Sequence, residues 1–176
     1  MTKTQLVWIA ELKKGNDLAA FNIYNDFVKA MYNTAIRITG STEVAQDIVQ
    51  DSFIAAFQKI SALKDPMAFA GWLKQIVVNN AVQYIRRNKI QFASVTDHDN
   101  LQEDHVEEDR ISDEELASAI RSLPEGCRTV LSLHLFEEMK HSEIAGVLSI
   151  SESTSKTQYR HAKKLLKEKL KHHYED

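Results

Sequence analysis

The sequence is poor in the residues that interrupt helices. It holds only five glycines and two prolines among 176 residues. Sandwiches and barrels need many tight turns, which draw on glycine and proline. The scarcity of both argues against a turn-rich β architecture and favours long helices. Because 43% of the residues are hydrophobic, the chain can still build a packed core.

Cysteine is nearly absent, and so are long apolar runs. The single cysteine, Cys127, cannot close a disulfide within the chain or supply a cluster of zinc ligands. This usage is typical of the reducing cytoplasm, where we expect the protein to act. No apolar run reaches the roughly 18 residues of a membrane span, so no direct membrane insertion is expected. Met1–Trp8 shows no signal-peptide pattern.

The net charge of −3 is unevenly distributed. Between Asp97 and Glu115 lie ten acidic residues and one basic residue, a net charge of −9. The rest of the chain carries 21 basic and 15 acidic residues, a net charge of +6. The chain is therefore basic apart from one acidic segment, and a nucleic-acid partner is compatible with its charge.

Hydrophobic periodicity predicts four helices in the first half of the chain. The first two cover about Gln5–Lys13 and Asp17–Ile38, the second ended by Gly40. A third begins after Ser41-Thr42, and a fourth begins at Asp65-Pro66, which pairs an N-cap residue with proline at the first helical position.

Asn88–Ser112 breaks this periodicity. The segment has few aliphatic residues and many acids, so it cannot bury enough apolar surface to offset a backbone entropy cost of about 1–2 kcal/mol per residue. Helical spacing then returns over about Glu114–Ser122, from Pro124, over Ser142–Leu148 and over Glu152–Lys171. We therefore predict an all-α chain with two small helical domains, residues 1–90 and 113–176, joined by a flexible acidic linker at 91–112.

The pattern from Glu143 to Ser151 is typical of a helix-turn-helix. A short amphipathic helix is followed by a turn and a new helix. Ala145 is small where the two helices approach, Ile150 supplies an apolar residue in the turn, and Ser151 is a strong N-cap for the second helix.

The helix after Ser151 has a basic face and an apolar face. Lys156, Arg160, Lys163 and Lys167 share one side at helical spacing, and Tyr159, Ala162, Leu166 and Leu170 share another. A recognition helix in the major groove needs such a division, with short polar residues at its N-terminal end to reach base edges. Ser153, Thr154, Thr157 and Gln158 lie there. The alternative is an ordinary C-terminal helix whose lysines face the solvent and do not bind DNA.

The fourth helix carries amides followed by arginines. Gln75, Asn79, Gln83 and Arg86 line one polar face, with Asn80 and Arg87 nearby. Such a face can bind unstacked bases and then phosphate. Trp72 precedes it, and from its residue type alone a place in the core is the preferred interpretation, because large aromatic residues are mostly buried.

No metal site, cofactor site or catalytic arrangement is expected. The histidines at 134 and 141 are predicted to lie in different elements, and those at 98, 105, 172 and 173 lie in the linker or the tail. The chain has no His-Glu-x-x-His motif and no glycine-rich phosphate loop. We therefore predict that it is not an enzyme.

Taken together, these motifs resemble a known family. Asp47–Phe53, Ala70–Ala81 and Tyr84–Arg87 resemble region 2 of the extracytoplasmic-function (ECF, group IV) sigma factors of the sigma-70 family. Leu123–Leu170 resembles their region 4. The resemblance implies a transcription initiation factor that binds core RNA polymerase and recognises the −10 and −35 elements of promoter DNA.

The resemblance also implies roles for individual residues. The helix with Asp47, Gln50, Asp51 and Phe53 would dock on the clamp helices of the polymerase β′ subunit. The loop 61–69 and the following helix would read the −10 element through Trp72, Gln75, Asn79, Asn80, Gln83, Arg86 and Arg87. The C-terminal domain would meet the β flap and read the −35 element through Ser151, Ser153, Thr154, Lys156, Thr157, Gln158, Arg160, Lys163 and Lys164. The linker would thread the active-site cleft, its acids imitating nucleic acid, and an anti-sigma factor is an implied partner.

Two positions depart from the family pattern. Ser155 stands where the family usually has a valine facing the domain core, and Gln158 stands where arginine is frequent. We expect the first change to weaken the apolar seat of the recognition helix. We expect the second to remove a phosphate contact or to change the preferred base.

Two other functions fit parts of the pattern. A conventional helix-turn-helix regulator would bind DNA without docking on polymerase, and a helical adaptor would use its basic helix on an acidic protein. The acids of Asp47–Asp51 also have a simple alternative as favourable charges in the first turns of a surface helix.

Overall fold

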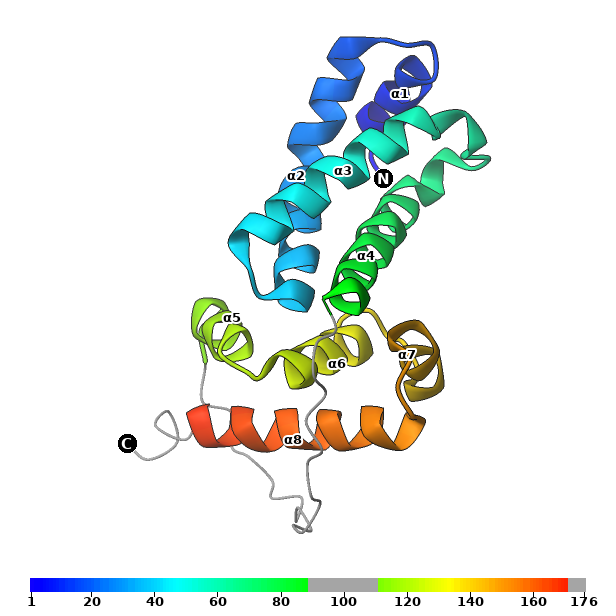
Figure 1. Cartoon of the computed structure of the whole chain (residues 1–176). Coiled ribbons are helices and arrows are strands. Elements are labelled where there is room, and N and C mark those ends of the chain that lie inside the picture. The colour runs from blue at the N-terminus through cyan, green and yellow to red at the C-terminus, as the bar shows by residue number, and fades with distance from the viewer. Residues whose placement is uncertain (89–110, 171–176) are drawn as a thin grey trace. The chain divides into compact units, whose positions relative to one another are not determined.

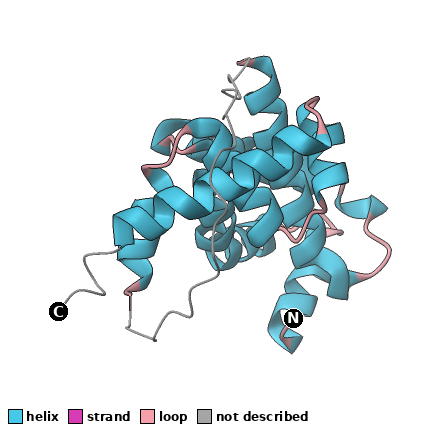
Figure 2. Ribbon diagram, turned by 90° about the horizontal axis from the view of Figure 1, so that it is seen from below, coloured by secondary structure: helices cyan, strands magenta, loops and turns pink. Residues whose placement is uncertain are grey.

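Within each described part of the chain, helices are joined by short turns (Figure 1). The computed structural model describes residues 1–88 and 111–170. The elements are α1 (Lys3–Leu12), α2 (Asp17–Thr39), α3 (Thr42–Gln58), η1 (Ile60–Ala62), η2 (Pro66–Ala68), α4 (Phe69–Arg87), α5 (Asp113–Arg121), α6 (Glu125–Leu135), α7 (His141–Leu148) and α8 (Glu152–Leu170), where η marks a 3-10 turn. Within the described ranges no strand occurs, as Figure 2 shows, and the all-α prediction is confirmed. The predicted acidic linker lies outside the described residues apart from Ile111 and Ser112.

Local signals set the helix boundaries of the first half. The Asn16 side chain accepts hydrogen bonds from the backbone amides of Leu18 and Ala19 and so begins α2. Gly40 ends α2 in the left-handed region at φ 72°, which a residue without a Cβ adopts at little cost. Ser41 then caps α3 by accepting from the Val44 amide. The predicted starts of both helices are confirmed.

The start of the fourth helix differs from the prediction in one respect. Pro66 opens the 3-10 turn η2, capped by the Asp65 side chain, and the α-helix proper begins at Phe69. The proline therefore still marks the point where the chain turns into the helix, but the first turn is tighter than an α-turn.

The chain divides into two compact units, Met1–Tyr84 and Ile85–Asp176, with the boundary in the last turn of α4. In the first unit α2 packs against both α1 and α3. Phe69 at the start of α4 is fully buried and meets Phe27 of α2 edge-on, with ring centroids 5.4 Å apart. This aromatic contact fixes the N-terminal end of α4 to the core of the unit.

In the second unit α8 packs against α5, α6 and α7. Its core contains Ile120, Leu123, Cys127, Leu131 and Ala162, with Phe136, Tyr159, Leu165 and Leu166 packed at the edge. The α7–α8 turn passes through Ser149, which adopts the left-handed conformation at φ 57°. Along the described part of the chain, no helix combines the length and apolar character needed to cross a membrane.

Candidate nucleic-acid interface

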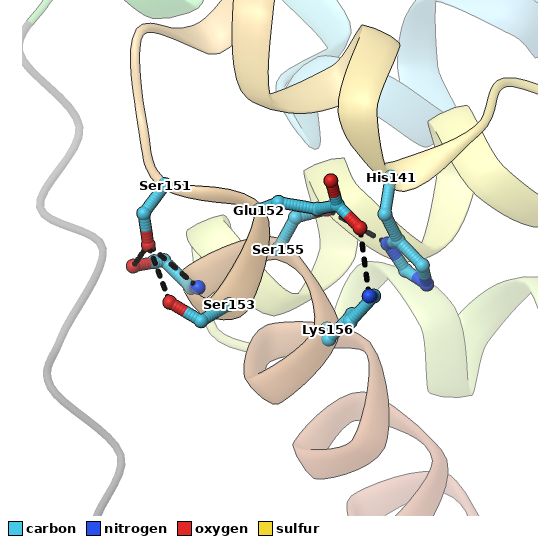
Figure 3. A network of polar contacts seen from close by, with 7 residues as sticks. His141, Ser151, Glu152, Ser153, Ser155 and Lys156 are labelled. Atoms are coloured by element: carbon cyan, nitrogen blue, oxygen red, sulfur yellow. Dashed lines mark hydrogen bonds and ion pairs between the residues drawn. The ribbon is translucent and has the colours of Figure 1, made fainter.

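The N-terminal end of α8 is built by a serine cluster (Figure 3). The Ser151 hydroxyl accepts a 2.9 Å hydrogen bond from the Thr154 amide, which satisfies one of the free amides of the first turn. The same oxygen lies 2.8 Å from Ser153 Oγ and 2.7 Å from Thr154 Oγ1. The predicted N-cap is therefore confirmed. The cluster presents several short hydroxyls at the positive end of the helix.

A basic stripe follows on the solvent side of α8. It consists of Lys156, Arg160, Lys163 and Lys167, all of which are exposed. Lys156 pairs with Glu152 at 2.7 Å, an exposed contact one helical turn away that a phosphate can replace at little cost. Lys163 lies over the Tyr159 ring at 5.9 Å from its centroid. The stripe is a continuous cationic surface suited to a phosphate backbone.

The remaining predicted −35 residues differ in exposure. Ser151 and Ser153 are exposed, and Thr154, Thr157 and Lys164 are half-buried at the edges of the helix. Gln158 is only 3% exposed, and its side-chain oxygen accepts a 3.0 Å hydrogen bond from the Cys127 thiol of α6. Gln158 is therefore turned into the helical unit in this structure, and its contact with DNA stays a prediction.

Ser155 faces the core, as its place in the family pattern implies. It is fully buried, and its hydroxyl lies 2.9 Å from His141 Nδ1 of α7 (Figure 3). The seat of the recognition helix is polar at this point, and a hydrogen bond between α7 and α8 takes the place of a hydrophobic contact.

A cluster of rings extends this polar seat. His134 of α6 stacks on His141, with ring centroids 4.3 Å apart, and both rings meet Tyr159 of α8 at 4.6 and 5.6 Å. The His134 Nδ1 donates to the Met139 carbonyl at 2.8 Å. Burial lowers the pKa of His141, helped by His134 and Lys156 and opposed by Glu152. Sequence spacing alone gave no sign of this contact between three helices.

The polar face of α4 is open to solvent. Gln75, Asn79, Gln83, Arg86 and Arg87 are all exposed, whereas Trp72 is half-buried, with its ring 6.1 Å from that of Phe69. The Gln75 side-chain amide donates to Asn79 Oδ1 at 3.0 Å, one turn along the helix. The face therefore presents a pre-ordered pair of amides followed by two cations.

Asn80 differs from its neighbours on α4. It is half-buried, and its side-chain amide donates to Ser52 Oγ of α3 at 2.9 Å. The buried Ser52 hydroxyl in turn donates to the Ile48 carbonyl at 2.6 Å. Asn80 thus holds α4 against α3 and does not belong to the open amide face.

The loop before α4 exposes a residue that the sequence did not single out. Met67 in η2 is 55% exposed, and its amide donates to Asp65 Oδ1 at 2.9 Å. A flexible thioether side chain at the start of a polar face is an adaptable apolar contact for a base. No periodic pattern marks such a residue, because the exposure of a loop position depends on the tertiary fold.

On α3 the predicted docking residues separate into two groups. Asp47, Gln50 and Asp51 are exposed and share one face. Phe53 is 2% exposed, with its ring 4.8 Å from that of Tyr24 of α2, so it packs in the core and its contact with polymerase stays a prediction. Its neighbour Ile54 is 49% exposed and follows Gln50 and Asp51 at the spacing of one helical turn. Ile54 is the apolar residue of this face.

Within the two described segments, no group of three or more His, Cys, Asp or Glu side chains could hold a metal ion. The buried Cys127 thiol has its pKa raised to about 11 by burial, which keeps it protonated. The arrangement is thus one of exposed cations, hydroxyls and amides suited to binding.

Comparison with known families matches both halves of the chain. The model of sigma-70 region 2 covers residues 23–90, and that of sigma-70 region 4 covers residues 113–166. The two regions occur in this order, and the helix-turn-helix lies within the second. The chain belongs to the ECF group of the sigma-70 family.

Curated relatives match most of the length of this family member. It is 28% identical to the ECF RNA polymerase sigma factor SigW of Bacillus subtilis, over 93% of this chain and 95% of the relative. It is also 28% identical to RNA polymerase sigma factor SigV of Bacillus subtilis, over 82% of this chain and 87% of the relative.

Solved structures share the fold of this ECF family member. CnrH in complex with the cytosolic domain of CnrY is 22% identical, with a TM-score of 0.50 over 96% of this chain and 97% of that one. The sigma factor RpoE of Bartonella quintana, in complex with the anti-sigma factor NepR, is 18% identical, with a TM-score of 0.50 over 85% and 97%.

Proposed function

We propose that the chain is a sigma factor that binds core RNA polymerase and directs transcription to promoters with paired −10 and −35 elements. The observation that carries this function is the exposed basic stripe of α8, in a chain that matches both DNA-reading regions of the family. The chain contributes recognition, and the polymerase performs the chemistry. It acts in the cytoplasm, where that enzyme is found.

The −35 element is read by α8 lying in the major groove. Its stripe of Lys156, Arg160, Lys163 and Lys167 faces the phosphates and fixes the position of the helix without reading sequence. Sequence is read at the N-terminal end by the hydroxyls of Ser153, Thr154 and Thr157, which are short enough to reach base edges. Lys164, half-buried beside the stripe, gives one more phosphate contact.

The −10 element is read by α4 and the turn before it. The amides of Gln75, Asn79 and Gln83 form hydrogen bonds with unstacked bases, and Arg86 and Arg87 bind the adjacent phosphates. Met67 and the exposed part of Trp72 supply apolar surface for a base that has left the stack. Asn80 acts indirectly by holding the helix in place.

Core polymerase is bound through α3. Asp47, Gln50, Asp51 and Ile54 form a face with an apolar residue surrounded by acids and an amide. Its expected counterpart is a helix with basic and apolar side chains, which the family resemblance identifies as the β′ clamp helices. An apolar anchor within a polar rim is the usual composition of a protein interface.

The remaining features fit the same function. Residues 1–90 form the region 2 domain, 91–112 the linker through the polymerase cleft, and 113–176 the region 4 domain, which also meets the β flap. The two solved relatives are held in complexes with CnrY and with the anti-sigma factor NepR. We therefore infer that an anti-sigma factor regulates this chain as well.

Reconstituted transcription tests the function. The purified chain is mixed with core polymerase and a library of random promoter fragments, and the transcripts are sequenced. The expected result is initiation that depends on the chain and occurs downstream of two short motifs. Tight binding to a palindromic duplex without polymerase would instead indicate a conventional helix-turn-helix regulator, and binding without sequence preference would indicate an adaptor.

A further inference from the structure

A pair of histidines joins the three helices of the helix-turn-helix unit. His134 of α6 and His141 of α7 stack nearly parallel, with an interplanar angle of 19° and centroids 4.3 Å apart. Tyr159 of α8 closes the cluster edge-on against His134 at 4.6 Å. The buried Ser155 of α8 bonds to His141 at 2.9 Å (Figure 3). The cluster therefore lies where α8 is seated on α6 and α7.

The hydrogen bonds of the pair fix where protons can be added. His134 Nδ1 faces a carbonyl oxygen, that of Met139, which can only accept, so Nδ1 carries the proton in every state. His141 Nδ1 faces the Ser155 hydroxyl, which can donate or accept. That bond therefore survives protonation of His141, and the effect of an added proton is electrostatic.

The charged groups around His141 disfavour a positive charge on its ring. His134 contributes from α6, Lys156 from α8, and Lys163 lies over the ring of Tyr159. Glu152 of α8 is the carboxylate that favours the charged form of His141, and it is already paired with Lys156. On α7 itself, the Glu143 carboxylate accepts from the Lys140 amide at the helix start.

We propose that His134 and His141 are positioning residues whose stacked rings hold the recognition helix α8 against α6 and α7, and that acidification loosens this seat. A positive charge on His141 is unfavourable beside His134, whose ring lies 4.3 Å away, and a movement of α7 away from α6 relieves this. Because Ser155 ties α7 to α8, such a movement displaces the N-terminal end of the recognition helix.

The direction of the pH dependence follows from the lowered pKa of His141. Its ordinary value is 6.5, so the unfolded chain takes up this proton before the folded one does. The contribution of neutral His141 to stability is complete above pH 6.5 and is lost as the pH falls through the lower pKa of the folded state. The contact of α8 with α6 and α7 is therefore stable at neutral pH and weakens in the acid range.

Hydrogen exchange of the full chain, measured by mass spectrometry, tests the seat without DNA. On moving from about pH 7.5 to about pH 5.5, protection of α7 and α8 amides, corrected for intrinsic exchange, should fall by roughly threefold or more. His141→Asn keeps a hydrogen-bonding group near the position of Nδ1 but cannot titrate, so its protection should change much less. Equal losses in both proteins would overturn the proposal.

A matched control lies on the recognition helix itself. His161 of α8 is outside the ring cluster, and His161→Asn should keep the full pH dependence of the native chain. If His141→Asn does not fold, the ring resonances of the native chain give the answer. His141 should then titrate below 6.5, the ordinary pKa of histidine, and an equal or higher midpoint contradicts the proposal.

The consequence for DNA rests on the proposed function of α8. Holoenzyme bound to a promoter taken from the library selection should lose affinity in the same pH range, and the His141→Asn holoenzyme should lose less. Loss of protection in α8 without loss of affinity would overturn the link to DNA. Failure of the native chain to select any promoter would count against the proposed function. The exchange measurement would still show whether acidification weakens the contact of α8 with α6 and α7.

Discussion

Asn80 of α4 donates a 2.9 Å hydrogen bond to Ser52 of α3 and so connects the proposed −10 helix with the proposed polymerase-docking helix. Ser52 is fully buried, and its hydroxyl uses its own proton on the Ile48 carbonyl. Removal of the Asn80 amide leaves the Ser52 oxygen without this donor. An unsatisfied buried polar group costs more than the hydrogen bond contributes.

The first prediction compares Asn80 with Asn79. Asn80→Ala should lower the free energy of unfolding by about 1–3 kcal/mol. Asn79→Ala, at the exposed neighbouring position, should change it by less than about 0.5 kcal/mol but impair −10 recognition. Both substitutions raise helix propensity by the same amount, so the difference between their free energies of unfolding isolates the contact with Ser52. Urea unfolding followed by tryptophan fluorescence measures it, because both tryptophans lie in the first unit. Equal stability of the two variants contradicts the assignment.

The second prediction separates Phe53 from Ile54. Phe53→Ala should destabilise the first unit by about 3–5 kcal/mol, since it empties a buried aromatic site. Ile54→Ala should leave the fold intact and weaken binding to core polymerase by more than about 1 kcal/mol. Leu18→Ala, at another exposed apolar position of the first unit, is the control for binding. Binding is measured by fluorescence anisotropy of labelled chain titrated with core enzyme, and unchanged affinity in Ile54→Ala would remove this residue from the docking face.

The third prediction concerns the base preference at the −35 element. Gln158→Ala removes the hydrogen bond with Cys127 and should lower the stability of the second unit by about 1–3 kcal/mol while leaving the selected −35 motif unchanged. Thr157→Val keeps the size of the side chain but removes the hydroxyl, and it should change the motif without a comparable loss of stability. Promoter selection with each holoenzyme is the measurement. A changed motif with Gln158→Ala would show that its amide leaves the core on binding.

The fourth prediction tests the basic stripe. Lys163→Ala should weaken holoenzyme binding to all promoters alike. It should also reduce the magnitude of the slope of log K against the logarithm of the salt concentration by about 1. Lys169→Ala is the matched control, because Lys169 is exposed on the same helix but off the stripe. Affinities measured over a range of salt concentrations give both slopes. If the two variants share the native slope, Lys163 does not contact phosphate.

Local signals in the sequence predicted most of the fold. Ser41, Asp65-Pro66 and Ser151 mark helix starts through hydrogen bonds or a fixed φ that lie within a few residues, so one stretch of sequence is enough to recognise them. The exposed stripe on α8 was likewise predictable, because four basic residues at helical spacing share a face whatever the helix packs against.

Contacts between helices were not predictable in the same way. Phe53 and Ile54 are adjacent apolar residues, and which of them is buried depends on where Tyr24 of α2 lies. Gln158 is buried because a thiol on α6 meets it, although its residue type is usually exposed. The stack of His134 on His141 depends on the angle between α6 and α7, which no local pattern specifies.

Two variants tested side by side address the central claim that α4 and α8 read separate promoter elements. Promoter selection is performed with holoenzymes that carry Asn79→Ala or Thr157→Val, and the recovered motifs are compared with those of the native chain. Asn79→Ala is expected to change only the motif near the start site, whereas Thr157→Val is expected to change only the upstream motif. If both variants alter the same element, or if neither alters any, the assignment of one helix to each element is wrong.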